Sequence, residues 1–294
     1  MTILVLGVTG MLGHKVFQYL RACVPGTLGA VRGRRREPPL DRVGLLQGDD
    51  VLEGFDLWDV GAVYTRLREI RPHVIVNCVG VIKQRLEAQR AVRCLRLNAL
   101  LPHELAELCA TWGGRLIHFS TDCVFSGRRG GYTEEDSSDA IDLYGQTKFL
   151  GEVTSSNAVT LRTSMIGREL VHRESLLEWF LSQGRATVRG FTQAFYSGVT
   201  TNHLAEVVHR IIVQHPDLHG LYQVASATLS KFELLCLLRE AFDRPTEIVP
   251  DSDFRCDRSL DGNKLRRAIG YECPPWPELV RQLARDPTPY EDWK

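Results

Sequence analysis

The chain has 294 residues, of which 44% are hydrophobic and 24% are charged. These proportions are typical of a globular protein with one large or two modest domains, and they exclude a collagen, a coiled coil or a disordered chain. Lys plus Arg and Asp plus Glu each number 36, so the formal net charge is zero. No overall field favours nucleic acid or anionic lipid, and neither is expected as a partner.

Cysteine and histidine usage predicts neither disulfides nor a metal site. The eight cysteines are scattered without a CxxC pair, and the nine histidines include no HExxH motif. Free thiols of this kind are typical of a reducing compartment. The first residues carry no basic signal segment, and about 18 consecutive apolar residues, the length of a membrane span, occur nowhere. We therefore expect a cytoplasmic protein.

Up to about residue 161, short β-branched apolar runs alternate with longer amphipathic stretches. This alternation predicts βαβ units around a parallel sheet whose strands are buried on both faces. Strands are predicted over residues 3–6, 27–31, 74–77, 115–119 and 158–161, and helices over 11–22, 60–71, 95–112 and from Tyr144 onward. The expected fold class is α/β, with a doubly wound Rossmann sheet.

After Leu161 the pattern loosens, with Gly and Pro between short elements. Helices are predicted over 176–182, 203–213 and 231–241, strands over 221–224 and 247–249, and a last helix that ends at Ala284. We expect residues 1–162 to form the dinucleotide-binding domain. Residues 163–294 would then be mainly a smaller substrate-binding lobe, from which the chain returns to the sheet.

Three glycines follow the first predicted strand at three-residue spacing, in Gly-Val-Thr-Gly-Met-Leu-Gly. Glycine permits a tight strand-to-helix turn and lets backbone N–H groups approach a pyrophosphate at the helix N-terminus. A tight turn without a ligand is the alternative. The predicted dinucleotide loop consists of Gly7, Thr9, Gly10, Met11, Leu12 and Gly13.

The end of the second predicted strand favours NADP(H) as the cofactor. An acidic residue at this place usually binds the ribose hydroxyls of NAD, whereas Arg accommodates the 2′-phosphate of NADP. The segment 32–36 contains four arginines, and no acid precedes Glu37. Arg32 and Arg34 are the predicted phosphate contacts. A solvated basic loop is the alternative, and NAD(H) stays open as the cofactor.

Tyr144 and Lys148, four residues apart, are predicted to share one helix face. A tyrosine is a poor acid–base catalyst near neutral pH unless a cation lowers its pKa, and Lys148 is placed to supply that charge. A hydroxyl at the end of the preceding strand, Thr121 first and Ser120 second, would hydrogen-bond a substrate carbonyl. Together with the glycine loop, these residues predict a reductase site.

At this point the chain resembles the extended short-chain dehydrogenases/reductases, and within them the dTDP-4-dehydrorhamnose reductase family. The resemblance covers nearly the whole chain, with its motifs in the family's order. They are Gly-Val-Thr-Gly-Met-Leu-Gly at 7–13, Arg-Pro-His-Val-Ile-Val-Asn at 71–77, Leu-Asn-Ala at 97–99, Ser-Thr-Asp-Cys-Val-Phe at 120–125, Tyr-Gly-Gln-Thr-Lys-Phe-Leu-Gly-Glu at 144–152 and Arg-Thr-Ser at 162–164.

The resemblance implies roles for individual residues. Thr121, Tyr144 and Lys148 match the catalytic triad, and Asn98 matches a structural helix residue of such enzymes. A cap or turn residue is the alternative for Asp56 and Asn98. Further implied cofactor contacts are Asp56 and Leu57 at the adenine, and Asn77, Cys78, Val79 and Gly80 after a strand. Residues 162–164 lead into the segment beside the nicotinamide.

Three departures from the family pattern fall where substrate is expected. Cys123 replaces an aromatic residue, Met165 replaces a frequent Trp, and the loop at 78–85 is unusually apolar. An aromatic-rich stretch between Trp179 and Tyr196 is expected to pack in the core, with a wall for a nucleotide base as the alternative. The reductase chemistry is therefore better supported than the identity of the sugar.

The expected function is NADPH-dependent reduction of a keto group on a nucleotide-activated deoxysugar, by a homodimer. Two alternatives stay open. One is an epimerase or dehydratase of the same fold, although dehydratases tend to place an acidic pair after the catalytic Thr and here Asp122 precedes Cys123. The other is a non-catalytic subunit that keeps the nucleotide site, as in the similar regulatory subunit of methionine adenosyltransferase.

Overall fold

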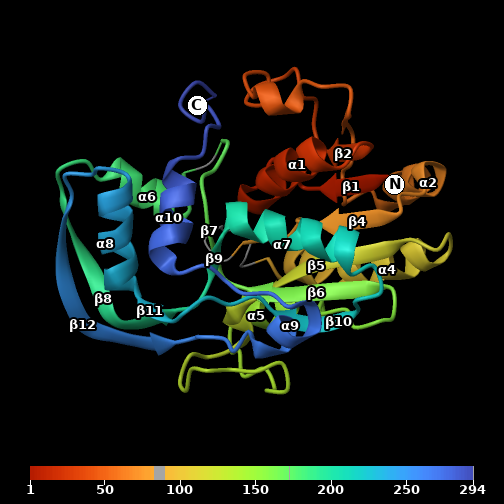
Figure 1. Cartoon of the computed structure of the whole chain (residues 1–294). Coiled ribbons are helices and arrows are strands. Elements are labelled where there is room, and N and C mark those ends of the chain that lie inside the picture. The colour runs from red at the N-terminus through yellow and green to blue at the C-terminus, as the bar shows by residue number, and fades with distance from the viewer. Residues whose placement is uncertain (83–89, 172, 294) are drawn as a thin grey trace.

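The computed structural model describes residues 1–82, 90–171 and 173–293. Its central sheet has seven parallel strands in the order β10-β6-β5-β4-β1-β2-β3 (Figure 1). The strands are β1 (Ile3–Leu6), β2 (Thr27–Ala30), β3 (Val51–Leu52), β4 (Val74–Asn77), β5 (Arg115–Thr121), β6 (Ala158–Thr163) and β10 (Gly220–Gln223). Strands β2 and β3 are added on one side of β1, and strands β4, β5, β6 and β10 are added on its other side. The predicted doubly wound α/β fold is confirmed, and ligands of such sheets bind where the strand order reverses.

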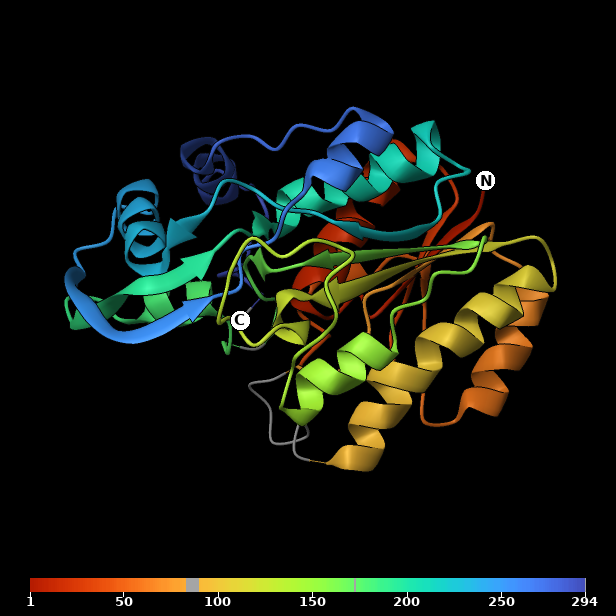
Figure 2. The same ribbon diagram turned by 90° about the horizontal axis from the view of Figure 1, so that it is seen from below.

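Helical layers cover both faces of the sheet, because the strands present apolar side chains on both sides. Ile3 and Val5 pack toward α1, α7 and α9, whereas Leu4 and Leu6 pack toward α2 and α4. Figure 2 shows the sheet between the two layers. The helices of these layers are α1 (Met11–Cys23), α7 (Thr201–Gln214) and α9 (Asn263–Ile269) on one face, and α2 (Val60–Ile70), α4 (Leu101–Ala110) and α5 (Leu143–Leu150) on the other.

The helix predicted over 95–112 is longer and less regular than expected. It begins as α3 (Ala91–Cys94), continues as the π-helix η3 (Leu95–Leu100) and becomes regular in α4, which carries Pro102 in its first turn. Short 3-10 helices η1 (Gly44–Leu46) and η4 (Asp122–Val124) follow β2 and β5. π-helical turns are rare in proteins and often lie at functional sites. This one contains Asn98.

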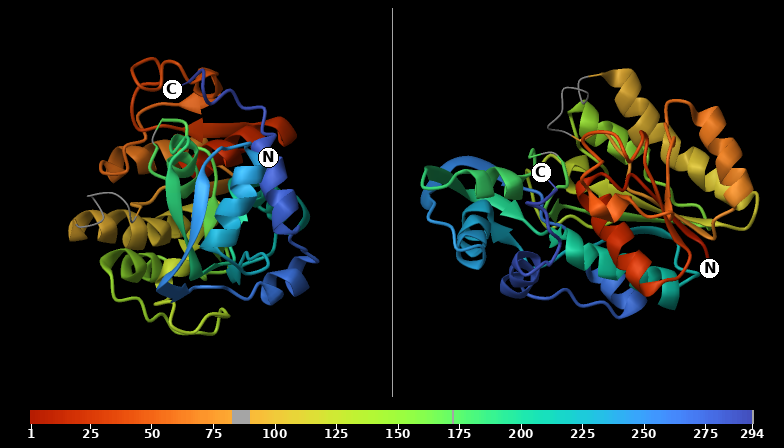
Figure 3. Two further views of the ribbon diagram at one scale, coloured as in Figure 1. Left: turned by 90° about the vertical axis from the view of Figure 1, so that its left-hand side faces the viewer. Right: turned by 90° about the horizontal axis from the view of Figure 1, so that it is seen from above.

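A smaller lobe lies at one end of the main sheet, as Figure 3 shows. Its three-stranded sheet has the order β11-β8-β12, with β11 (Leu229–Ser230), β8 (Thr187–Tyr196) and β12 (Glu247–Asp257). Helices α6 (Leu176–Ser182), α8 (Lys231–Ala241) and α10 (Trp276–Ala284) pack on it around Phe180, Leu234, Leu238 and Leu279. The pair β7 (Met165–Ile166) and β9 (Val199–Thr200) connects the two parts.

Residues after 163 also return to the main body. Strand β10 pairs with β6, and the last residues of the chain pack against α1. There the Lys15 ammonium lies 2.5 Å from an Asp286 carboxylate oxygen, and His14 Nε2 lies 2.8 Å from the Tyr290 hydroxyl. No helix among the described residues is long and apolar enough to span a membrane.

Candidate active site

The turn between β1 and α1 brings two backbone segments into close contact. Gly7 has a φ of +80°, and a Cβ there would lie 2.9 Å from Val79 Cγ2 and 3.2 Å from the Cys78 carbonyl carbon. A Cβ on Gly13 would collide with the Gly7 backbone. In the described structure α1 begins at Met11 without a side-chain cap or an acidic residue in its first turn. Its first N–H groups are therefore available to a phosphate.

A cavity of about 630 Å³ lies at the carboxyl ends of β1, β2, β4 and β5. This is the place that the reversal of strand order predicts for a ligand. The structure thereby brings together most of the predicted site residues. Those that line the cavity are Gly7, Thr9, Gly10, Met11, Leu12, Arg32, Asp56, Leu57, Asn77, Cys78, Val79, Gly80, Tyr144 and Lys148.

Four predicted site residues do not line this cavity; they are Gly13, Arg34, Asn98 and Thr121. Asn98 is fully buried and acts on the loop after β4: its Oδ1 accepts from the Val81 N–H at 2.8 Å, and its Nδ2 donates to the Val81 carbonyl at 3.3 Å. Because Val81 itself lines the cavity, Asn98 holds part of the wall in place. This contact agrees with the structural role that the resemblance implies.

The arginines after β2 lie in different environments. Arg32 is exposed and borders the cavity. The Arg34 side chain is 78% exposed and pairs with Glu37 at 3.5 Å. The backbone N–H of Arg35 donates to Glu53 at 2.8 Å. Of the two predicted phosphate contacts, Arg32 is therefore the one that a ligand in the cavity would meet.

Helix α5 carries Tyr144 and Lys148 one turn apart. Its N-cap, Asp142, accepts from the Gly145 N–H at 2.8 Å and fixes the start of the helix. Lys148 is almost fully buried, and its Nζ donates to the Phe119 carbonyl at 2.6 Å. The ammonium is thus held against β5, with the half-buried Tyr144 one turn before it.

A buried polar row extends from Lys148 across two strands. Lys148 Nζ lies 3.4 Å from His118 Nε2, and His118 Nδ1 lies 3.2 Å from Asn77 Nδ2. Burial lowers the pKa of Lys148 to about 8, and the nearby charge of Glu152 opposes this shift. Burial first, and then the Lys148 charge, lower the pKa of His118 well below its ordinary value. His118 is therefore neutral near pH 7.

The pKa of Tyr144 differs from the expectation. Burial raises it above its ordinary value, Cys123 adds to the increase, and a hydrogen bond with Thr121 opposes it. The structure thereby corrects the prediction that Lys148 holds this pKa down. The physical reason is that desolvation of the phenolate outweighs the favourable contacts. The Thr121 hydroxyl also accepts from the Cys123 N–H at 3.2 Å, at the carboxyl end of β5.

The smaller lobe supplies the other side of the cavity. Ser164, the last residue of the Arg-Thr-Ser motif, belongs to this wall, as do Met165, Tyr196 and Lys231. Of the aromatic stretch, Tyr196 lines the cavity, whereas Phe180 is fully buried in the lobe's core. The sequence gives no signal for Lys231. The apolar loop noted at 78–85 lies only in part within the described residues, since 83–85 fall outside them.

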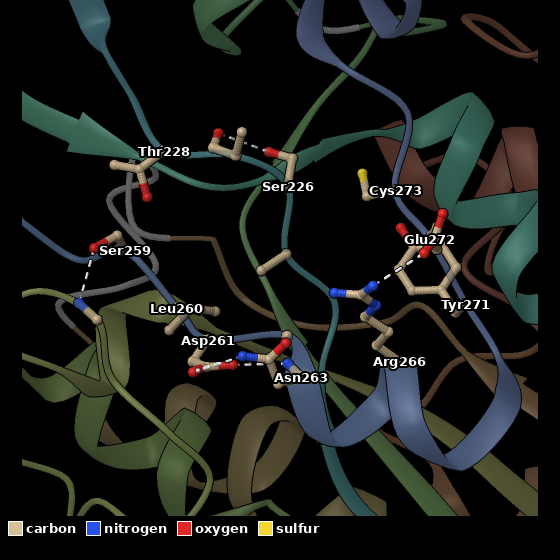
Figure 4. Close-up of a pocket in the computed structure, with 14 residues that line it drawn as sticks. Ser226, Thr228, Ser259, Leu260, Asp261, Asn263, Arg266, Tyr271, Glu272 and Cys273 are labelled. Atoms are coloured by element: carbon tan, nitrogen blue, oxygen red, sulfur yellow. Dashed lines mark hydrogen bonds and ion pairs between the residues drawn. The ribbon is translucent and has the colours of Figure 1, made fainter.

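A second cavity, of about 570 Å³, has a polar lining whose groups pair with one another (Figure 4). Arg266 and Glu272 form an ion pair at 3.1 Å, and the Asn263 N–H donates to Asp261 at 2.7 Å. This cavity shares no lining residue with the first one. Within the described part of the chain, no group of three His, Cys, Asp or Glu side chains is placed to hold a metal.

The cavity combines a glycine turn before the uncapped N-terminus of α1 with the pair Tyr144 and Lys148. This combination defines a Rossmann-type protein of the extended short-chain dehydrogenase/reductase class. The chain belongs to the family of the RmlD substrate binding domain, whose model matches residues 1–287.

The relatives include proteins of two different names. The chain is 27% identical over 258 residues to methionine adenosyltransferase 2 subunit beta of Mus musculus, covering 83% of this chain and 73% of the relative. It is 34% identical over 134 residues to dTDP-4-dehydrorhamnose reductase of Streptomyces griseus, covering 45% and 43%. A crystal structure of dTDP-4-dehydrorhamnose reductase from Bacillus anthracis in complex with NADP has a TM-score of 0.78 at 21% identity, covering 96% of this chain and 98% of that one.

Proposed function

We propose that this protein is an NADPH-dependent reductase of a keto group on a nucleotide-activated deoxysugar, such as a 4-keto-6-deoxyhexose. The observation that carries the proposal is that Tyr144, Lys148 and the glycine loop share one cavity. Membership of the family and the similarity to a dTDP-4-dehydrorhamnose reductase support it. A site that brings a cofactor loop and a proton donor together has the parts that carbonyl reduction needs.

The residues present fit a dinucleotide. The uncapped N-terminus of α1 and the close approach at Gly7 leave room and N–H donors for a pyrophosphate, and Arg32 would meet a 2′-phosphate. Asp56 and Leu57 would lie at the adenine end. NADPH, when bound, supplies a hydride to the carbonyl carbon.

The chain's own residues would handle the proton. Tyr144 would donate its phenolic proton to the carbonyl oxygen, and its high pKa keeps that proton in place at neutral pH. Thr121, which hydrogen-bonds with Tyr144, would orient the phenol and the carbonyl. Lys148 would stabilise the phenolate that is left and contact the nicotinamide ribose.

The Tyr144→Phe variant tests this function, because it removes one oxygen and little volume. We expect turnover to fall roughly 10²- to 10⁴-fold while NADPH affinity stays nearly unchanged. The measurement is the rate of NADPH oxidation with a panel of nucleotide 4-keto-6-deoxysugars. Tyr222→Phe is the matched control, because Tyr222 lies outside the cavity. Full activity of Tyr144→Phe would exclude Tyr144 as the proton donor.

Similarity to the beta subunit of methionine adenosyltransferase favours a second candidate, a non-catalytic regulatory subunit. This candidate predicts tight NADPH binding by a wild-type protein that reduces no keto-sugar on the panel. An epimerase or dehydratase would convert its substrate without net consumption of NADPH, so product analysis in the same assay distinguishes it. A cytoplasmic location and a homodimeric state stay predictions.

A further inference from the structure

Tyr196, at the end of β8, is a buried phenol whose oxygen faces no well-placed partner. The residue is only 4% exposed and lines the cavity. Among the described residues, no group meets both the distance and the angle of a hydrogen bond to its hydroxyl. Ser164 is near enough to influence this hydroxyl, and it lines the same cavity. Leaving such a polar group unpaired is costly, so a ligand that completes its hydrogen bond would gain affinity.

Lys231, the first residue of α8, stands directly over this phenol. Its Nζ lies 3.9 Å from the centre of the Tyr196 ring, a cation–π contact, and the half-buried side chain lines the same cavity. Within the described residues no carboxylate lies within ion-pair distance of this ammonium. The wall of the smaller lobe therefore presents a positive charge and a hydroxyl to the same space.

Tyr196 and Lys231 lie near the carboxyl end of β5, where Thr121 is the last residue. The charge of Asp122, the residue after Thr121, acts on both Tyr196 and Lys231. The glycine loop and Arg32, which would hold the dinucleotide phosphates, come from the β1 and β2 side of the cavity. Four cationic side chains of the described residues therefore border the cavity, namely Arg32, Arg93, Lys148 and Lys231, and Lys231 is the one that the smaller lobe supplies.

We infer that Lys231 and Tyr196 bind the diphosphate of a nucleotide-activated substrate. This inference rests on the proposed function, since it assigns one part of that substrate to one wall of the site. A diphosphate carries negative oxygens that accept from both an ammonium and a phenol, and a partly desolvated lysine binds such a group more strongly than a fully hydrated one. The smaller lobe thereby supplies the charge that holds the substrate while its sugar reaches Tyr144.

The test is a calorimetric titration of UDP and dTDP into protein saturated with NADP, which occupies the dinucleotide site beforehand. We expect Lys231→Met to weaken nucleoside diphosphate binding roughly 10- to 100-fold and Tyr196→Phe about tenfold. Lys231→Arg should recover part of the affinity. Lys264→Met is the matched control, because Lys264 also lies over a tyrosine ring, that of Tyr222, but does not line the cavity.

NADP affinity and thermal unfolding of each variant show whether the fold and the dinucleotide site survive. Equal UDP and dTDP affinity of wild type and Lys231→Met would overturn the inference, and so would an equal loss of NADP affinity or a wild type that binds neither diphosphate. The proposed reductase is judged separately, by NADPH oxidation. A wild type that binds UDP through Lys231 but reduces nothing would refute the reductase alone, whereas turnover with an unchanged KM in Lys231→Met would refute the diphosphate anchor alone.

Discussion

We predict that the buried ion pair between Glu152 and Arg162 contributes strongly to the free energy of unfolding. The Arg162 side chain is 1% exposed and that of Glu152 is 5% exposed. Arg162 donates twice to Glu152, at 2.9 and 2.7 Å, and the Ser120 hydroxyl donates to the same carboxylate at 2.6 Å. The guanidinium carbon also lies 4.9 Å from the centre of the Phe125 ring. Removal of the carboxylate would leave a buried guanidinium without its counter-charge.

Glu152→Gln keeps the volume and one acceptor oxygen but removes this charge. Breaking a buried pair costs about 3–5 kcal/mol, and we expect about 3 kcal/mol because one hydrogen bond to the amide oxygen can persist. This is a large share of the roughly 5–15 kcal/mol by which a typical domain is stable. Urea unfolding, followed by circular dichroism, measures the change in the free energy of unfolding.

The exposed pair of Arg266 and Glu272 provides the control, since the two side chains are 60% and 77% exposed. Glu272→Gln should cost less than about 1 kcal/mol. Glu152 also opposes the burial that lowers the pKa of Lys148, so Glu152→Gln should lower this pKa further below about 8. Equal unfolding free energies for Glu152→Gln and Glu272→Gln would refute the argument that burial makes this pair strong.

Three further predictions concern the cofactor site and the C-terminal contact. Arg32→Ala should weaken NADPH binding more than NADH binding, whereas Arg34→Ala should change neither, as titrations with both cofactors would show. Gly13→Ala should weaken NADPH binding and lower stability by about 1–3 kcal/mol, because its Cβ would collide with backbone, whereas Gly33→Ala meets open space. Burial alone would raise the pKa of Asp286, but hydrogen bonds from neighbours including Lys15 hold it at about 2, below the ordinary 3.8. The stability from this carboxylate is therefore fully present above about pH 4 and is lost as the pH falls toward 2.

Each of these three has an outcome that contradicts it. For the arginines, it is an equal loss of NADPH affinity in both variants. For the glycines, it is a Gly13→Ala protein that unfolds and binds NADPH like Gly33→Ala. For Asp286, acid unfolding of Asp286→Asn should be less steep than that of wild type between pH 4 and 2, and identical curves would contradict the argument.

The amino-acid sequence by itself determined most of the main sheet and the glycine turn after its first strand. Strands such as β1 and β4 are buried on both faces, so their apolar runs are continuous and stand out against the amphipathic helices. The glycine loop and the Tyr144–Lys148 spacing are local patterns, because a turn and a helix face involve few neighbouring residues. These local signals identified most of the predicted residues that line the cavity of about 630 Å³.

Only the tertiary structure decided the strand β8 of the smaller lobe and the electrostatics of the site. Strand β8 buries Val188, Gly190, Ala194 and Tyr196 along one face, and small residues in this pattern give a weak strand signal. Lys231 reaches the cavity because α8 packs against β8, a contact between distant segments that no local pattern records. The pKa of Tyr144 depends on the water that folding removes around it, which is why a sequence that places Lys148 one turn away still predicted the wrong direction.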